Sequence, residues 1–460
     1  MSLDLNTLPQ LLKIAKSCGA DGADAVMFAT TNISISQRMG RPEGIERSEN
    51  SAVGLRVFVR QNNSKAGQSN GEIGQANVSS TDISKDALLE LAERAVAMAR
   101  LAPADDDSTL APAAFYPKNI KNLDLLDVDE PTPAWLLEQC SIAEDTARNV
   151  TGITNSEGAD ASYSRSRVSL AVAGDDGEDF LGSYEGSYFS TSVSVLAGVG
   201  TSMERDYDFT SARHRQDLKS PKDIGLSAAN RAIARLNPRK VASCQTTVIF
   251  DPRVSKSLLS ILTSSISGNS IARGASFLKD SLNSQIFSKN ISIIDNPHLA
   301  RGFASKPFDM EGVANKKMGL VEDGVLQTWL LDIRTANKLK LNTTGHASRG
   351  LASPPSPSST NVYMENGKLS PQELMADIKS GLYLTETFGM GINTITGDYS
   401  QGAAGFWIEN GEIAYPVSEI TIAGNLKDMF LGITPANDLT FRYSTNAPTI
   451  RVENMTVAGV

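Results

Sequence analysis

The segment from residue 391 to residue 429 constrains the fold more than any other part of the chain. Near its centre, Asn410 and Gly411 separate two apolar runs, residues 406–408 and 413–415. Asn and Gly both tolerate positive φ, so this pair between strand-like runs predicts a tight β-hairpin. The preceding residues 396–405 are rich in glycine and polar side chains, and they predict a loop. Because ordering glycine costs backbone entropy, such a loop usually serves a binding site.

The best candidate binding residues of the sequence lie in this predicted loop. Asp398 and Tyr399 can bind the amides of an extended peptide, and Ser400 can add a polar contact. The alternative is that Asp398 caps a turn and the glycines only let the chain bend. Both interpretations fit the residue types. The candidate substrate-binding residues are Thr396, Gly397, Asp398, Tyr399 and Ser400.

Periodicity in the first half of the chain predicts helices combined with antiparallel strands. Apolar residues recur at helical spacing in residues 5–15 and again in residues 85–99. Between them, residues 53–59 alternate as a half-buried strand does. The prolines and three consecutive aspartates of residues 103–117 predict an exposed connector. Thr132 and Ser220, each followed by proline, predict two further helix starts.

Asn237-Pro238 predicts the main domain boundary, because 460 residues exceed a single typical core. Beyond it, residues 370–373 form a capping box with proline at the first turn, and residues 450–457 alternate as a strand. The sequence therefore predicts an α+β protein. Residues 1–237 are expected to form a mixed domain with antiparallel strands, and residues 238–460 a mainly antiparallel, β-rich domain.

Composition and charge narrow the class of protein. The formal net charge is −9 and the chain has no extended Lys/Arg cluster, which argues against nucleic-acid binding. Cys18, Cys140 and Cys244 are widely spaced and odd in number, which is typical of reduced thiols. The sequence has no basic leader with an apolar core and no apolar run of membrane-spanning length. We therefore expect a cytoplasmic protein that does not bind a membrane.

Three short patterns suggest chemistry, and each has a simpler interpretation. Residues 67–71 match G-x-S-x-G, but no helical period follows directly, whereas a nucleophile elbow lies between a strand and a helix. Residues 389–391 lack the third glycine of a dinucleotide-binding loop. Three acids could pair as catalytic carboxylates, although solvated or ion-paired acids are commoner: Asp251, Asp309 and Glu311. These patterns therefore predict no catalytic residue.

Longer stretches of the sequence resemble the TldD/PmbA family, on its PmbA (TldE) side. The strongest match is residues 396–429, TGDYSQGAAGFWIENGEIAYPVSEITIAGNLKDM. Shorter matches follow the family order: residues 154–166 (TNSEGADASYSRS), 204–209 (ERDYDF), 235–241 (RLNPRKV) and 305–313 (SKPFDMEGV). Together they extend the resemblance over nearly the whole chain.

The resemblance implies a zinc metallopeptidase whose active subunit, TldD, carries H-E-x-x-x-H on a helix. There the two His hold zinc and the Glu is the general base. In this chain the motif positions fall on Ser264, Ser265 and Asn269. Hydroxyls and an amide are poor zinc ligands, and Ser265 cannot act as a base near pH 7. No two of the three histidines are spaced to share a helix face: His214, His298 and His346.

By this resemblance, the chain is expected to be the non-zinc-binding subunit of a heterodimer. A TldD-like partner would supply the zinc, the activated water and the Glu base, while this chain closes the chamber and helps hold small or unfolded peptides. No cofactor is expected in this chain, and a homodimer is expected when the partner is absent. Two alternatives stay open: a stand-alone homodimeric peptide- or protein-binding regulator, and an independent hydrolase with an unrecognised nucleophile.

Overall fold

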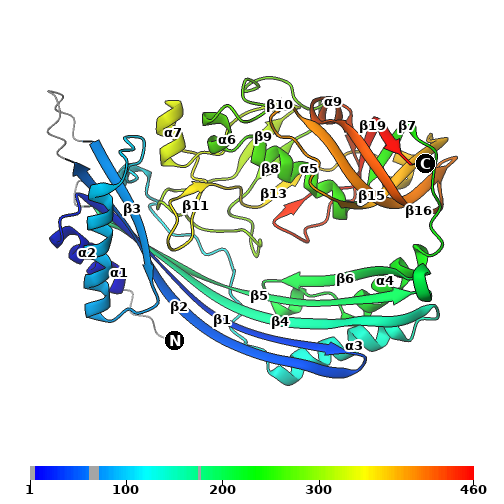
Figure 1. Ribbon diagram of the computed structural model, residues 1–460, viewed down its shortest axis with the longest axis horizontal. Helices are drawn as coiled ribbons and strands as arrows, with labels where there is room; N and C mark the ends of the chain where they lie inside the picture. The colour runs from blue at the N-terminus through cyan, green and yellow to red at the C-terminus, as the bar shows by residue number, and fades with distance from the viewer. Residues whose placement is uncertain (1–5, 62–71, 175–177, 460) are drawn as a thin grey trace.

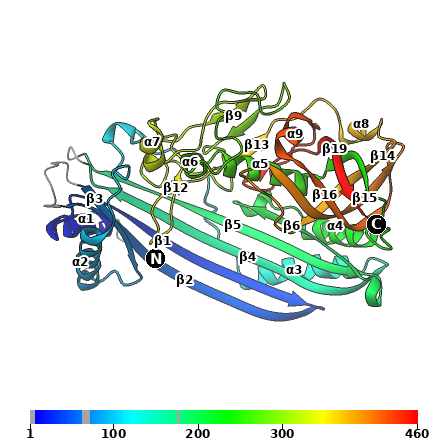
Figure 2. The same cartoon turned by 45° about the horizontal axis from the view of Figure 1, so that its top comes forward.

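The first half of the chain forms one long, curved antiparallel sheet. The computed structural model describes residues 6–61, 72–174 and 178–459. Six strands pair in the order β3-β2-β1-β4-β5-β6. Figures 1 and 2 show them bent so that the concave face lies toward the C-terminal half. The strands are β1 (Gly22–Arg38), β2 (Arg41–Gln61), β3 (Glu72–Ser80), β4 (Ile153–Val172), β5 (Phe180–Ala197) and β6 (Glu204–Ala212).

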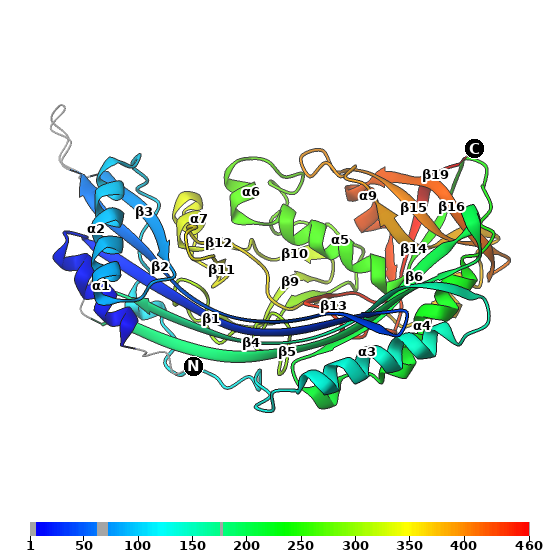
Figure 3. The same ribbon diagram turned by 60° about the horizontal axis from the view of Figure 1, so that its bottom comes forward.

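Two pairs of helices pack against the sheet, one pair toward each end. The first pair covers the buried residues Ala25, Leu55 and Val57. The second pair covers Ile33, Phe189 and their neighbours, and Figure 3 shows it on the convex side. The helices are α1 (Thr7–Ser17), α2 (Lys85–Leu101), α3 (Pro133–Arg148) and α4 (Pro221–Ala234). The predicted helices and strands of this half are confirmed, with longer strands than the alternation indicated.

The predicted helix starts at Thr132 and Ser220 are confirmed by their caps. Thr132 Oγ1 accepts the N–H of Trp135 at 3.2 Å, and Ser220 Oγ accepts the N–H of Lys222 at 3.2 Å. Each cap is followed by proline in the first turn. The first N–H groups of a helix have no intrahelical acceptor, so these caps satisfy donors that would otherwise depend on water.

Replacing Thr132 with Ala should therefore lower the free energy of unfolding by about 1 kcal/mol, because the Trp135 N–H loses its acceptor. Urea unfolding followed by circular dichroism measures the change. Thr81→Ala is the matched control, since Thr81 is an exposed residue outside any helix or strand, and it should shift the value by less than about 0.5 kcal/mol. Equal losses in the two variants would contradict the role of the cap.

The prediction of an exposed connector at residues 103–117 is wrong in part. The segment has little regular structure, but Ser108 and Ala111 are buried. Asp105 accepts a hydrogen bond from Arg334 Nε at 2.6 Å. The segment thus contacts the second half of the chain through the Asp105 carboxylate and through the Asp107 backbone carbonyl, which accepts from Asn337 Nδ2 at 2.8 Å.

Six strands of the second half pair into one sheet, and five of them close into a small barrel. They pair in the order β16-β15-β14-β7-β19-β17, and an additional pairing of β16 with β19 closes the barrel. The predicted hairpin is confirmed: β15 and β16 pair antiparallel around Asn410 and Gly411, which have φ of 51° and 85°. The strands are β7 (Cys244–Phe250), β14 (Ser380–Phe388), β15 (Asp398–Glu409), β16 (Glu412–Asn425), β17 (Ile433–Pro435) and β19 (Ile450–Ala458).

A second, looser sheet and five short helices complete this half. The sheet order is β10-β9-β8-β13-β18, and β11 (Ala347–Ser348) pairs only with β12 (Ser356–Pro357). Its strands are β8 (Ile293–Asp295), β9 (Met318–Glu322), β10 (Val325–Leu326), β13 (Val362–Met364) and β18 (Thr445–Asn446). The helices are α5 (Pro252–Ser265), α6 (Gly268–Ala272), α7 (Ile333–Leu339), α8 (Pro371–Met375) and α9 (Leu426–Leu431). The predicted α+β class with a β-rich second half is confirmed.

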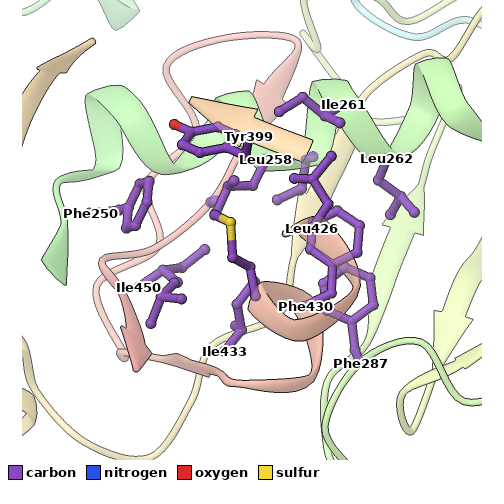
Figure 4. Close-up of a cluster of buried hydrophobic side chains, with 14 of the residues drawn as sticks. Phe250, Leu258, Ile261, Leu262, Phe287, Tyr399, Leu426, Phe430, Ile433 and Ile450 are labelled. Carbon is purple, nitrogen blue, oxygen red and sulfur yellow. The ribbon is translucent and has the colours of Figure 1, made fainter. Parts of the chain in front are cut away.

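The largest buried cluster joins α5 to the barrel. Figure 4 shows Leu258 and Leu262 of α5 beside Tyr399, Leu426 and Phe430. Phe430 also stacks on Phe287 with ring centroids 4.5 Å apart. This packing fixes α5 on the barrel while its opposite face stays polar. Among the described residues, no helix is long and apolar enough to cross a membrane.

The prediction of a loop over residues 396–405 is wrong from Asp398 onward, where β15 begins. The glycines fit a strand because neighbours occupy the space that side chains would need. A Cβ on Gly405 would lie 2.1 Å from the carbonyl oxygen of Tyr383, and one on Gly402 would lie 2.4 Å from the ring of Phe388. Glycine here permits close packing of strands rather than flexibility.

Candidate functional site

The three residues expected at the motif positions lie where α5 ends and α6 begins. Asp251 caps the start of α5 by accepting the N–H of Arg253 at 2.9 Å. The helix ends at Ser265, and the N–H of Gly268 donates to the Leu330 carbonyl at 2.8 Å as α6 begins. A Cβ on Gly268 would lie 2.5 Å from Thr335 Oγ1, so only glycine fits this approach. The motif positions are therefore divided between two helices.

The three side chains have different surroundings. Ser264 is exposed, and its hydroxyl donates to the Ser260 carbonyl at 2.9 Å. Ser265 is fully buried, and its hydroxyl has no hydrogen-bond partner within the described part of the chain. Asn269 is half-buried, and its backbone carbonyl oxygen accepts from Arg273 Nε at 3.1 Å. Neither hydroxyls nor an amide match the donors that zinc selects, so these residues do not fit a zinc ion.

The histidines take part in separate local contacts. His214 Nε2 lies 2.9 Å from the Asp124 carbonyl oxygen, and His298 Nε2 lies 2.7 Å from Asn315 Oδ1. His346 is 2% exposed, with Nδ1 2.8 Å from Thr344 Oγ1. Within residues 6–61, 72–174 and 178–459, no three His, Cys, Asp or Glu side chains are grouped so that they could hold a metal ion.

The predicted substrate-binding residues form a turn and the first residues of β15. Gly397 has φ of 88°, and Thr396 Oγ1 donates to Asp398 Oδ2 at 2.6 Å. Asn425 Nδ2 donates to the other oxygen of Asp398 at 3.2 Å. The carboxylate of Asp398 is thus held by two neighbouring side chains, and both Asp398 and Thr396 remain exposed.

The remaining two candidates, Tyr399 and Ser400, point in different directions. Tyr399 is 2% exposed and belongs to the core beside α5, where burial raises the pKa of its phenol. Ser400 is exposed on the alternate face of the strand. The turn also adjoins the segment after α6, because the N–H of Phe277 donates to the Thr394 carbonyl at 2.8 Å. The structure therefore brings residues 396–400 and the α5–α6 junction into one region of the barrel.

The concave face of the long sheet carries a row of hydroxyls. Ser34, Ser162, Ser190 and Ser211 lie opposite one another across β1, β4, β5 and β6. Successive side chains alternate between the faces of a strand, so these serines point away from the apolar residues that pack on α3 and α4. All four are half-buried, and Ser190 Oγ lies 3.3 Å from Ser211 Oγ. No local sequence pattern indicates this row, because it depends on the pairing register of the strands.

A buried ionic cluster joins one end of the sheet to the second half. Asp24 of β1 accepts from Arg56 Nε at 2.7 Å and also pairs with Arg349. Arg56 Nη1 lies 3.6 Å from Glu311, whose Oε2 accepts the N–H of Ile333 at 2.8 Å. Burial raises the pKa of Glu311 to about 8, with Arg56 opposing that shift. Glu311, which was predicted to be solvated or ion-paired, is therefore paired with Arg56 and buried where the sheet meets the second half of the chain.

A second group of ion pairs joins the other end of the sheet to α5 and the barrel. Asp206 of β6 pairs with Arg253 at 2.9 Å, and Asp208 pairs with Arg442 at 2.8 Å. A cleft of about 330 Å³ opens beside them. Lys256 lies 3.1 Å from the centre of the Tyr443 ring, and burial together with Arg442 lowers the pKa of Lys256 to about 8. The second half is thus fixed to the sheet at both ends.

The G-x-S-x-G match at residues 67–71 lies outside the described residues. Asp251 and Asp309, the other acids considered, have structural partners. Asp251 caps α5 and accepts from Tyr383 at 3.0 Å, and Asp309 accepts from the N–H groups of Glu311 and Val313. These contacts account for both side chains without a catalytic pair.

Comparison with known proteins identifies the family. Three family models match in order: PmbA/TldA metallopeptidase domain 1 at residues 23–99, the central domain at residues 176–236 and the C-terminal domain at residues 243–459. A metalloprotease PmbA from Escherichia coli O157:H7 is 37% identical over 442 residues, which covers 96% of this chain and 93% of that protein.

Two solved structures share the fold. A putative modulator of DNA gyrase from Bacteroides thetaiotaomicron is 26% identical, with a TM-score of 0.87 over 100% of both chains. TldE from Thermococcus kodakarensis is 21% identical, with a TM-score of 0.83 over 98% of this chain and 99% of that chain. With one relative 37% identical across nearly its whole length, this chain belongs to the PmbA/TldD family of metallopeptidases.

Proposed function

We propose that this chain is the PmbA/TldE-like subunit of a heterodimeric zinc metallopeptidase, and that a TldD-like partner holds the zinc. One observation supports the proposal: the residues that the resemblance assigns to the motif positions, Ser264, Ser265 and Asn269, are divided between two helices. A buried hydroxyl, an exposed hydroxyl and an amide supply neither a metal cage nor a general base.

The contribution of this chain would be to shape the chamber and hold the substrate. Ser34, Ser162 and Ser190 on the concave face can each donate and accept a hydrogen bond. Such groups suit the amides of an extended backbone whatever its side chains, which fits small or unfolded peptides as substrates. Three free cysteines also fit a cytoplasmic location.

Zinc content and peptidase activity test whether the partner alone holds the zinc and whether cleavage needs both subunits. The chain, a TldD-like partner from the same source and their equimolar mixture are each assayed for zinc by mass spectrometry and for cleavage of an unstructured fluorogenic peptide. We expect no stoichiometric zinc in the isolated chain, and cleavage only in the mixture, abolished by a chelator.

Three outcomes would contradict the proposal. One zinc bound per isolated chain would show that other residues complete a metal site. Chelator-insensitive cleavage by the isolated chain, lost on mutation of a single serine, would support the independent hydrolase. A chain that is isolated only with copies of itself, and never with a partner bearing H-E-x-x-x-H, would favour the stand-alone regulator.

A further inference from the structure

Basic side chains gather around the cleft of about 330 Å³ beside β6. This basic cleft opens where β6 and α4 meet α5 and the segment between β17 and β18. Figure 1 shows α4 beside β6 at this end of the sheet. The chain as a whole carries a formal net charge of −9, so the concentration of positive charge is local. The basic residues that line the cleft come from three parts of the chain: Lys219, Arg231, Arg253 and Arg442.

The two acidic residues that line the cleft already have hydrogen-bond donors. Asp251 accepts the N–H of Arg253 at 2.9 Å and the hydroxyl of Tyr383 at 3.0 Å. Asp438 accepts the N–H of Thr449 at 2.8 Å and the hydroxyl of the same residue at 2.7 Å. All four carboxylate oxygens are thus engaged with backbone or hydroxyl groups, although Asp251 also lies 3.5 Å from Arg253 Nε.

On β6, behind the cleft, one carboxylate serves two guanidinium groups. Arg231 Nη1 lies 3.3 Å from Asp208 Oδ1, and Arg442 Nη2 lies 2.8 Å from the same oxygen. Asp206 pairs separately with Arg253 at 2.9 Å. Because Asp208 balances only one of its two arginines, a positive charge remains at the cleft.

Two lysines add positive charge without an acidic partner. Lys219 is exposed, and Lys256 lies with Nζ 3.1 Å from the centre of the Tyr443 ring, which lines the cleft. Neither lysine forms an ion pair within the described residues. The Lys256 ammonium is disfavoured by burial and by Arg442, which together lower its pKa to about 8. An anion in the cleft would stabilise the charged form of both lysines.

Arg442 is held in place before any ligand binds. Its guanidinium carbon lies 4.9 Å from the centre of the Phe209 ring, and its Nη2 donates to the Phe209 carbonyl at 2.6 Å. Its backbone N–H donates to Asn446 Oδ1 at 2.9 Å, and Asn446 is 2% exposed. A guanidinium that is already ordered loses little conformational entropy when it binds an anion.

The arrangement of these groups favours a phosphate over a carboxylate. A carboxylate is planar and is matched by one guanidinium that approaches in its plane. A phosphate group presents three acceptor oxygens in different directions, and the cleft has basic groups on three sides. The volume lies near the lower end of the range for small-molecule pockets, roughly 300–1,000 Å³, which suits a compact ligand.

From these observations we propose that the basic cleft binds the phosphate group of a small molecule, with Arg231 and Arg442 as the principal donors. The ligand is inorganic phosphate or a compact phosphomonoester, since both present the same group. The bound anion would connect β6 and α4 to the second half of the chain. The proposal uses neither the motif positions nor a partner, so it does not depend on the proposed function.

Isothermal titration calorimetry on the purified full chain tests the ligand class. Inorganic phosphate, glycerol 3-phosphate, malonate and chloride are compared at constant ionic strength, so that screening alone changes nothing. We expect one phosphate per chain, and binding of malonate and chloride weaker by about tenfold or more. The tighter of the two phosphate compounds identifies the source. The same compound should raise the unfolding temperature as its concentration increases, because it binds only the folded chain.

Two matched pairs of variants test the location. Thr440 is exposed and lines the cleft, so Thr440→Glu adds a carboxylate there without removing a basic group, and it should weaken phosphate binding about tenfold or more. Thr434→Glu, at an exposed residue outside the cleft lining, should change binding less than about threefold. Lys219→Gln should weaken binding about threefold or more, whereas Lys222→Gln, which removes the same charge outside the lining, should not. Circular dichroism checks that each variant is folded.

Four results would overturn the proposal. The first is the absence of saturable phosphate binding below about 10 mM. The second is malonate binding that is tighter than phosphate binding. The third is a Thr440→Glu variant that is folded and binds phosphate as the wild type does. The fourth is an equal loss of binding in Lys219→Gln and Lys222→Gln, which would show that net charge rather than the cleft determines affinity.

Discussion

Replacing Asp24 with Asn is expected to lower the free energy of unfolding by about 3–5 kcal/mol, the cost typical of breaking a buried ion pair. Asp24 is 0% exposed, and its carboxylate is the shared partner of Arg56 and Arg349. Two atoms of Arg349, Nε and Nη2, already lack partners among the described residues. The substitution removes the carboxylate that pairs with both buried guanidinium groups, and it leaves Arg56 with Glu311 at 3.6 Å.

Guanidinium chloride unfolding measures this loss, and Asp106→Asn is the matched control. Asp106 is exposed, so the same chemical change there should shift the free energy by less than about 0.5 kcal/mol. Trypsin should also cleave the Asp24→Asn variant faster than the wild type under native conditions, because the cluster around Asp24 holds the two halves of the chain together. A loss of less than 1 kcal/mol would show that Arg56 and Arg349 find other partners.

Local signals in the sequence were sufficient for the parts of the fold that depend on neighbours along the chain. Asn410 and Gly411 formed the predicted hairpin because their positive φ values are set by the residues themselves. The caps at Thr132 and Ser370 formed because the side chain bonds within its own first turn. These interactions need no knowledge of the tertiary structure.

Predictions failed where distant segments decide the conformation. Residues 398–405 were expected to be a loop, but β14 and β16 pair with them from both sides and make them a strand. Closure of the barrel depends on β16 meeting β19, which no local pattern records. Asp24 and Arg349 are 325 residues apart, so the buried cluster that joins the two halves was invisible in the sequence.

For the candidate site, the sequence supports a prediction of its chemistry, which stays a prediction, but none of its geometry. The residue types at Ser264, Ser265 and Asn269 already argued against zinc, and this required only the motif. The break between α5 and α6 was not expected, because it depends on Gly268 packing against Thr335. The concave row of serines likewise exists only through strand register.

Because of Glu311, the free energy of unfolding should fall as pH rises from about 5 to about 8. Its folded-state pKa is raised from 4.5 to about 8, first by burial and then by Asp309 and Asp332, against the attraction of Arg56. Between those two values the folded state keeps a proton that the unfolded state has released. Folding then takes up a proton, so each unit of rising pH costs about 1.4 kcal/mol until Glu311 ionises.

Glu311→Gln removes that proton while keeping an oxygen that can accept the N–H of Ile333. We therefore expect the free energy of unfolding of the variant to rise relative to that of the wild type by several kcal/mol between about pH 5 and about pH 8. Below about pH 4.5, the two free energies should change in parallel with pH. Denaturant unfolding at half-unit pH steps measures the difference between the two curves. Asp309, whose pKa burial also raises, is present in both proteins. Glu412→Gln, at an exposed position, should leave the pH profile unchanged. Parallel curves for wild type and Glu311→Gln would show that Glu311 is already ionised at neutral pH and that Arg56 outweighs its burial.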